Sequence, residues 1–363
     1  MIPISKPFLE GNELKYVTEA VESNWVSSIG KYIPLFEESF ASFIGSNFGV
    51  AVSNGTVALH LGLEALGIGK GDEVIVPDLT FVASPNSIIY TGAKPVFADV
   101  SKENWNIDPE AIREKITKKT KAIMPVHLYG APCKMDEIME IAVENDLKVI
   151  EDCAESHGAE FNGKKLGSFG DCGTFSFYGN KIMTSGEGGI VTTNNEELAE
   201  KMMLLRDHAM SKKKRYWHEI VGFNYRITNL QAALGLAQTE KINFFIERRD
   251  KIAEKYNSLL KDVKGITLQK EIPNSKNVCW LYSVLIEDEF GKSRNEVMKL
   301  LAEKGIDSRP FFYPCHTMPP YLKKESFPVS ENLSLKGMNL PTFIGLKDEE
   351  IEFIADTIIS LKE

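Results

Sequence analysis

The chain has 363 residues, which is enough for a sizeable core and two domains. Its formal net charge is −9, and hydrophobic and charged residues make up 43% and 26%, an ordinary balance for a globular protein. This negative charge argues against general binding to a nucleic-acid backbone. No apolar run is long enough to span a bilayer. We therefore expect no nucleic-acid partner and no membrane partner.

Cysteine usage and the first residues indicate the compartment. The five cysteines are irregularly spaced and form neither a CxxC pair nor a Cys/His zinc pattern. The segment MIPISKPFLEGNE lacks the charged start and apolar stretch of a signal peptide. We expect a cytoplasmic protein without a metal site.

The predicted elements alternate along the first two thirds of the chain. Residues 1–12 form an extended arm, and helices are predicted over 13–23, 34–44 and, after a strand at 48–52, 57–66. Short apolar runs then predict further strands at 72–77, 122–127, 148–151, 173–177 and 189–193. Continuous apolar strands separated by helices are typical of a mostly parallel sheet covered on both faces.

A second region follows. Apolar residues at helical spacing predict a helix over 229–243, and a charged helix around 247–255 continues from it. A strand at 278–286 and helices at 294–304 and 349–362 predict an α+β unit, with residues 310–321 as a Pro-rich loop. We expect a large domain over residues 1–244 and a smaller C-terminal one over 245–363.

Lys181 and Asp152 each follow an apolar run that predicts a buried strand. Lys181 ends the segment Thr-Phe-Ser-Phe-Tyr-Gly-Asn-Lys, and Asp152 ends Lys-Val-Ile-Glu-Asp. A constrained lysine can lose its proton and form a Schiff base. An amine and a carboxylate at such strand ends are what pyridoxal 5′-phosphate (PLP) requires, because the lysine holds the aldehyde and the carboxylate pairs with the pyridinium nitrogen.

A candidate phosphate site precedes them. Ser53-Asn-Gly55-Thr56 opens the helix after the strand at 48–52, and small residues at a helix N-terminus can bind an anion. A plain helix cap is the alternative for this segment. Ser176, five residues before Lys181, is a second candidate phosphate donor.

Further candidates surround this core. Phe81 could stack on a flat heterocycle or be an ordinary core residue. Glu155 could reach the phenolic oxygen of the cofactor, and His157 is either close to it or structural. Asn224 and Arg226 suit an anion. The basic residues 212–215 form either a solvated loop or an attraction site for an anionic substrate.

The chain resembles the DegT/DnrJ/EryC1/StrS family of sugar aminotransferases over nearly its full length. The resemblance rests on the motifs SNGTVALHLGLEALGIGKGDEVIVP, EDCAESHGA, FSFYGNK, GEGG and GFNYRITNLQAALGLAQ. It implies the PLP-dependent aminotransferase fold type I and a homodimer with active sites at its interface.

The resemblance also implies residue roles. Lys181 carries the cofactor as an aldimine and moves a proton in each half-reaction, and Asp152 pairs with the pyridinium. Phe81 stacks on the ring. Gly55, Thr56 and Ser176 hold the phosphate, with Asn224 reaching in from the neighbouring subunit. A lysine at position 181 argues against the dehydratase chemistry of relatives that carry histidine there.

Within the family, the segments NWNID, PVHLYG, RYWH and RPFFYPCHTMPPY are most similar to members that use L-glutamate to aminate GDP-4-keto-6-deoxymannose to GDP-perosamine. Arg226, Arg309, Tyr313 and His316 are the candidate substrate contacts. Two alternatives stay open. One is an aminotransferase for a UDP- or dTDP-linked ketosugar or a small phosphorylated ketone, and the other is an inactive PLP-binding regulatory protein.

Overall fold

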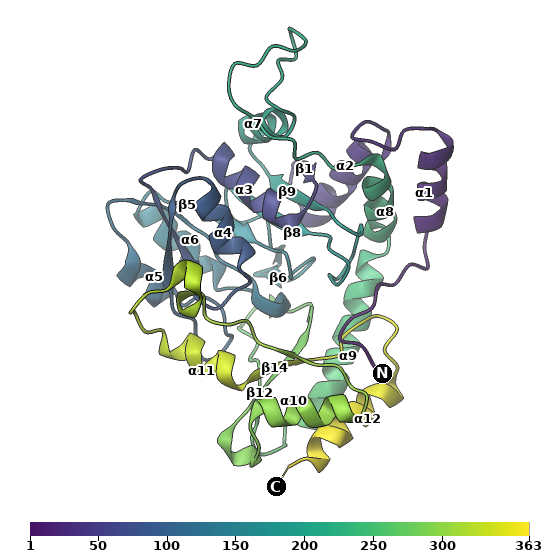
Figure 1. Cartoon of the computed structure of the whole chain (residues 1–363), viewed down its shortest axis with the longest axis vertical. Helices are drawn as coiled ribbons and strands as arrows, with labels where there is room; N and C mark the ends of the chain where they lie inside the picture. The colour runs from purple at the N-terminus through teal and green to yellow at the C-terminus, as the bar shows by residue number, and fades with distance from the viewer. Residues whose placement is uncertain (363) are drawn as a thin grey trace.

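The computed structural model describes residues 1–362, and its centre is a seven-stranded sheet (Figure 1). The strand order is β1-β9-β8-β5-β4-β2-β3, with β2, β3, β4, β5 and β8 parallel and β9 antiparallel to both of its neighbours. The strands are β1 (Phe48–Val52), β2 (Glu73–Pro77), β3 (Lys94–Ala98), β4 (Thr120–Ile123), β5 (Lys148–Asp152), β8 (Cys172–Ser176) and β9 (Gly189–Thr193). The mostly parallel sheet that the apolar runs predict is confirmed.

Helices cover both faces of this sheet. Along β2, Val74 and Val76 pack into one core while Ile75 packs into the other, as the two-residue period of a strand requires. The core around Val74 takes side chains from α3 (Gly55–Ala65), α4 (Ala83–Tyr90) and α7 (Glu196–Arg206). The core around Ile75 takes them from α2 (Tyr32–Ile44), α5 (Pro109–Lys115), α6 (Met135–Glu144) and α8 (Asn229–Thr239). Burial on both faces explains why the strands read as continuous apolar runs.

A second, antiparallel sheet follows in the order β10-β12-β14-β13. Its strands are β10 (Ile266–Leu268), β12 (Tyr282–Ile286), β13 (Arg309–Pro310) and β14 (Gly337–Leu340), and it packs with α9 (Ile242–Leu260), α10 (Arg294–Glu303) and α12 (Asp348–Ser360) around a core of its own. Helix α9 contributes Phe245 to the first region and Tyr256 to this second core. It therefore ties the two sheets together (Figure 1).

The remaining elements are short or peripheral. Strands β6 (Glu160–Phe161), β7 (Lys164–Lys165) and β11 (Ser275–Lys276) form a small third sheet. Helix α1 (Glu13–Glu22) packs on α8, and α11 (Pro328–Lys336) precedes β14. Residues 1–362 also contain four 3₁₀ turns: η1 (Leu128–Gly130), η2 (Asp288–Phe290), η3 (Cys315–Thr317) and η4 (Pro319–Tyr321). Among residues 1–362, no helix combines the length and apolar character needed to cross a membrane.

Two predicted strands are shorter in the structure. The run at 122–127 forms strand β4 only as far as Ile123, and Pro125, which has no N–H for a ladder, separates it from an isolated bridge between Val126 and Asp152. The run at 278–286 becomes a strand only at Tyr282. Its first residues turn instead, because Cys279 has a left-handed φ of 47°.

Candidate active site

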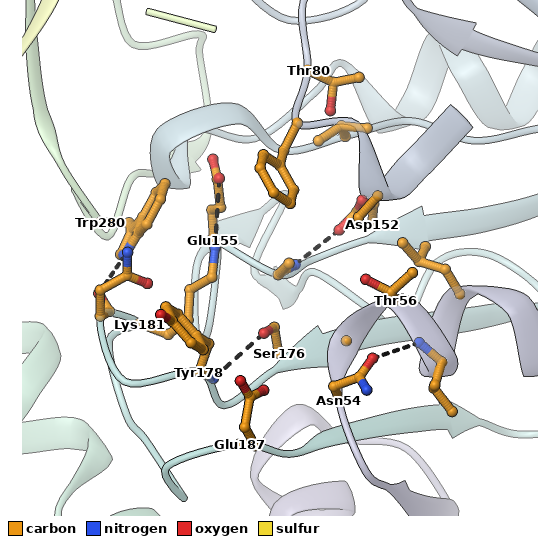
Figure 2. Close-up of a pocket in the computed structure, with 18 of the residues that line it drawn as sticks. Asn54, Thr56, Thr80, Asp152, Glu155, Ser176, Tyr178, Lys181, Glu187 and Trp280 are labelled. Atoms are coloured by element: carbon orange, nitrogen blue, oxygen red, sulfur yellow. Dashed lines mark hydrogen bonds and ion pairs between the residues drawn. The ribbon is translucent and has the colours of Figure 1, made fainter. Parts of the chain in front are cut away.

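The main cavity of the protein, about 730 Å³ in volume, opens where β5 and β8 end. Ligands of open α/β sheets bind at such carboxyl ends. The sequence candidates Gly55, Thr56, Phe81, Asp152, Glu155, Ser176 and Lys181 all line this cavity. Figure 2 shows side chains from β5, from the turn after β8 and from the start of α3 directed toward one space.

Lys181 lies in the turn after β8, where its backbone N–H donates to the carbonyl of Tyr178 at 3.0 Å. Its Nζ lies 3.6 Å from Oε1 of Glu155 and 3.8 Å from the ring centroid of Trp280. Burial lowers the pKa of Lys181, and the charge of Glu155 opposes this shift. A buried amine with a lowered pKa can act as both a nucleophile and a base.

Asp152 is the last residue of β5. Its Oδ2 accepts a hydrogen bond from Oγ of Ser84 at 2.8 Å, and its Oδ1 accepts one from the N–H of Ala154 at 3.1 Å. Burial raises the pKa of Asp152, while these two donors lower it. A cationic ring nitrogen facing this carboxylate would offset the cost of its buried charge.

Glu155 is also buried in the main cavity. Its Oε2 accepts the backbone N–H of Tyr129 at 2.8 Å, and burial raises the pKa of Glu155 to about 7. Tyr129 itself has a left-handed φ of 56° within η1. A carboxyl group with such a pKa can hold or release a proton near neutral pH.

The start of α3 forms one end of the cavity. Asn54 caps the helix, since its Oδ1 accepts the N–H of Val57 at 2.9 Å, and the first-turn amides of Gly55 and Thr56 have no acceptor within the helix. Gly55 lies against Ser176 so closely that an added Cβ would be 2.6 Å from the Cβ of Ser176. This close approach forms a cradle of helix amides and hydroxyl groups that suits a phosphate.

Phe81 and the aromatic residues around it separate the main cavity from a second hollow. This side cavity, about 410 Å³, shares Thr80, Phe81, Asn180, Trp280 and Phe312 with the main cavity, and the rings of Phe81 and Phe312 are 5.7 Å apart. Arg309 and Tyr313, two of the predicted substrate contacts, line the side cavity. Phe81 is 55% exposed, which does not fit an ordinary core phenylalanine.

Three other candidates lie outside both cavities. Arg226 donates to Oδ1 of Asn224 at 2.8 Å and pairs with Asp207 at 2.8 Å. His316 is buried, and its Nδ1 lies 2.7 Å from Oδ2 of Asp78. His316 therefore fastens the loop after β13 to the end of β2, and the structure does not bring it to the predicted substrate site.

His157 is structural in this arrangement. It is fully buried among the rings of Phe40, Phe175 and Phe177, and its Nε2–H donates to the carbonyl of Ser176 at 2.9 Å. Burial lowers the pKa of His157 to about 3, so the ring stays neutral. It supports the strand end at Ser176 from behind the cavity.

A buried cluster of His127, Glu151 and Cys153 lies next to β5, with one ligand-type atom from each residue within 4.8 Å of the others. The Glu151 carboxylate of this cluster already has hydrogen-bond partners within the protein. Glu151 accepts the amides of Gly167, Phe169 and Gly170 at 2.8 to 2.9 Å. We therefore interpret the cluster as a brace for the turn that precedes β8.

Two residues had no signal in the sequence: Ser84, which lies behind the lining residue Asp152, and Trp280, which lines both cavities. Ser84 acts through its hydrogen bond to Asp152, and Trp280 belongs to a run that predicted a strand. Trp280 and Asn180 are 100 residues apart in the sequence, yet the indole Nε1–H donates to the Asn180 carbonyl at 2.8 Å. A pattern within one segment cannot reveal such a contact.

Comparison with known proteins gives the family of this fold and site. The model of the DegT/DnrJ/EryC1/StrS aminotransferase family matches residues 7–359. The chain belongs to this family. Its members are PLP-dependent enzymes of fold type I, so the chain is a PLP-dependent aminotransferase.

Individual relatives agree with this assignment. The chain is 47% identical to GDP-perosamine synthase of Caulobacter vibrioides, covering 97% of this chain and 95% of that protein. It is 46% identical to GDP-perosamine synthase of Vibrio cholerae, covering 99% and 98%. The solved structure of an aminotransferase from Psychrobacter cryohalolentis has a TM-score of 0.94 at 33% identity, covering 99% of this chain and 98% of that one.

Proposed function

We propose that this enzyme transfers the amino group of L-glutamate to C4 of GDP-4-keto-6-deoxymannose and so forms GDP-perosamine. The observation that carries the proposal is one cavity that joins Lys181, Asp152 and the amide cradle of α3. These are the three kinds of group that PLP requires. The identity of 46–47% to GDP-perosamine synthases over nearly the whole chain supports the choice of sugar.

The cavity residues fit PLP as follows. Gly55, Thr56 and Ser176 would hold the phosphate, because the first-turn amides and two hydroxyl groups converge there. Asp152 would face the ring nitrogen and Phe81 the ring surface. When bound, the cofactor supplies a conjugated cationic ring that takes up the electron pair left by the departing α-proton of the amino acid.

The amine of Lys181 carries the proton. In the first half-reaction, Nζ would accept the proton from Cα of glutamate and release it to the cofactor carbon that bears the nitrogen, and the lowered pKa of Lys181 keeps part of the amine in its basic form. In the second half-reaction, the same Nζ would take a proton from that cofactor carbon and deliver it to C4 of the sugar. Such a positioned base contributes about 10²–10⁴-fold to the rate.

The side cavity is the proposed place for the part of the sugar nucleotide beyond the keto sugar. It adjoins the main cavity through Phe81 and Phe312 and carries the cation of Arg309 and the ring of Tyr313. A guanidinium binds phosphate oxygens well, and an aromatic ring can stack on a base. Arg226 is proposed to act with Asn224 from a neighbouring subunit, because both lie outside the cavities of their own chain.

We also propose a homodimer with the active site at its interface, built from a large domain over residues 1–244 and a small one over 245–363. Exposed aromatic side chains support an interface, with Tyr90, Tyr216 and Trp217 between 49% and 76% exposed. The cytoplasm is the proposed compartment, since all five cysteines are free and buried.

The test is a panel of GDP-, UDP- and dTDP-linked 4-ketosugars with L-glutamate and PLP. We expect oxoglutarate to form with the GDP-linked 6-deoxymannose ketone at a kcat/KM at least about tenfold above that for the other sugars, a difference of about 1.4 kcal/mol. A preference for a dTDP- or UDP-linked sugar would replace the proposed substrate. Absence of glutamate turnover with every ketone would favour a PLP-binding regulator instead.

A further inference from the structure

Trp280 is fixed at three points around the turn of Lys181. Its backbone N–H donates to the carbonyl of Tyr129 at 2.9 Å, and its own carbonyl accepts from Nη1 of Arg249 at 2.8 Å. Its indole Nε1–H donates at 2.8 Å to the carbonyl of Asn180, the residue before Lys181. These contacts leave the ring plane little freedom.

The ring face meets the lysine amine. Nζ of Lys181 lies 3.8 Å from the centroid of the Trp280 ring, within the distance at which a cation is attracted to an aromatic face. On another side, the same Nζ lies 3.6 Å from Glu155. Figure 2 shows the Lys181 side chain directed between these two groups.

This contact crosses between distant parts of the chain. Trp280 precedes β12 of the second sheet, whereas Lys181 follows β8 of the first. Trp280 is 5% exposed and lines both cavities. A buried indole N–H needs an acceptor wherever it lies, and here that acceptor is the backbone carbonyl beside Lys181, so that the ring face meets the amine.

We propose that Trp280 is a positioning residue that holds the free amine of Lys181 over the main cavity between its two proton transfers. The proposal rests on the proposed function, in which the amine is free while it carries the proton. The indole face attracts the ammonium form of Nζ, and the indole N–H fixes the backbone at Asn180. Trp280 thereby favours the ammonium form of Lys181 and fixes the backbone from which the lysine side chain extends.

Other groups of the same site also influence the protonation of the Lys181 amine. Asp152 ends β5 and Glu155 follows it, while Glu187 lines the cavity on the side of β9. The carboxylates of Asp152 and Glu155 favour the ammonium form, and burial disfavours it. Replacement of Trp280 keeps all of these charged side chains, and Trp280→Phe also keeps an aromatic ring that buries the amine.

The experiment uses the full chain without PLP, so that it does not depend on turnover. Lysines are trace-labelled with acetic anhydride from pH 6 to 11, and mass spectrometry gives the labelling midpoint of Lys181. The proteins are the wild type, Trp280→Phe and Trp280→Leu. Trp217→Phe is the matched control, because Nζ of Lys214 lies 3.9 Å from that ring in another segment.

We expect the Lys181 midpoint to fall in the order Trp, Phe, Leu, by about one pH unit in total, as loss of a partly desolvated cation–π contact implies. Trp217→Phe should leave it unchanged. An equal or higher midpoint in Trp280→Leu overturns the proposal. If Trp280→Leu does not fold by circular dichroism, Trp280→Phe decides, and an unchanged midpoint there overturns it.

A second readout uses PLP-loaded enzyme. At saturating glutamate, we expect Trp280→Phe to slow the single-turnover loss of the visible cofactor absorbance by several fold, while the dissociation constant of PLP stays within about twofold. Weakened PLP binding at an unchanged rate would instead give Trp280 a purely structural role. A wild type that shows no turnover contradicts the proposed function but leaves the labelling result on Trp280 intact.

Discussion

Glu155 and Lys181 form a buried pair in which Oε1 and Nζ lie 3.6 Å apart. Burial raises the pKa of Glu155 to about 7 and lowers the pKa of Lys181, so the two values approach each other from opposite sides. The pair can therefore exchange a proton near neutral pH. This is a property that an aminotransferase needs at its catalytic amine.

The raised pKa of Glu155 predicts a pH-dependent stability. Because folding raises this pKa from 4.5 to about 7, the contribution of Glu155 is complete below its ordinary pKa and is lost as pH rises through about 7. Glu155→Gln cannot ionise. We expect urea denaturation of the PLP-free proteins between pH 5 and 8 to show a smaller fall in unfolding free energy for the variant, by about 3 kcal/mol.

The control for this measurement is Glu352→Gln, a change at an exposed glutamate that pairs with Lys255. It should follow the wild-type pH dependence. Parallel curves for the wild type and Glu155→Gln would mean that Glu155 keeps its ordinary ionisation in the folded protein, and the proton exchange with Lys181 would lose its basis.

Lys181→Ala should abolish the visible absorbance of the lysine-bound cofactor and reduce turnover by at least about 10²–10⁴-fold. PLP retention after gel filtration would separate loss of chemistry from loss of binding. Lys255→Ala is the matched control, since this lysine pairs with Glu352 on the surface. Near-normal rates in Lys181→Ala would exclude Lys181 as the catalytic amine.

Asp152→Asn should fold but lose most activity. The amide keeps a hydrogen-bonding side chain near Ser84 and Ala154 yet removes the charge that faces the ring, a cost of about 3–5 kcal/mol for a buried pair. Steady-state kcat and circular dichroism check this together. Ser84→Ala, which removes one donor to Asp152, should cost only about tenfold, and unchanged kinetics in Asp152→Asn would refute the role of its charge.

The sequence predicts those parts of the site that depend on local structure. Lys181, Asp152 and Gly55 each lie next to a strand whose apolar run is visible in the sequence, and parallel strands bring their carboxyl ends to one edge. The same reasoning predicts most of the large sheet. It misses β3 (Lys94–Ala98), a short run that begins with an exposed lysine followed by a proline.

Contacts between distant segments account for what the sequence does not predict. The irregular aromatic loop around His316 suggests a sugar contact, but its partner Asp78 is 238 positions away in the chain. The apolar run around Trp280 predicts a strand, although the turn at Cys279 and the hydrogen bond to Asn180 determine its place. Only the packing of the two sheets creates these neighbours.

Gly55→Ala tests the phosphate cradle. The new Cβ would lie 2.6 Å from the Cβ of Ser176, so the helix start or the strand end must move. We expect PLP affinity, measured by absorbance titration, to fall by at least about tenfold, which corresponds to 1.4 kcal/mol. Gly62→Ala is the control, since an added Cβ in the middle of α3 would lie 3.1 Å from the sulfur of Cys172 and 4.0 Å from Ile150 and Thr174, and none of these residues lines the main cavity.

Ser176→Gly in the Gly55→Ala background removes the atom that clashes. If steric displacement is the cause, the double variant should bind PLP more tightly than Gly55→Ala alone, even though it lacks the Ser176 hydroxyl. The alternative outcome is a double variant whose loss of PLP affinity equals the sum of the losses in the two single variants. The two residues would then act independently, and the close packing of α3 on β8 would not matter for PLP binding.

His316→Ala and Arg309→Ala separate stability from substrate binding. His316→Ala leaves the buried carboxylate of Asp78 without its 2.7 Å partner, so we expect about 3–5 kcal/mol of destabilisation in urea. Its glutamate and sugar half-reactions should be affected alike.

Arg309 is 57% exposed at its side chain and pairs with Asp307, so Arg309→Ala should leave stability nearly unchanged. Because Arg309 lines the side cavity, this variant should raise the KM for the sugar nucleotide by at least about tenfold while the glutamate half-reaction keeps its rate. Selective loss of the sugar half-reaction in His316→Ala would instead show that His316 contacts the sugar substrate.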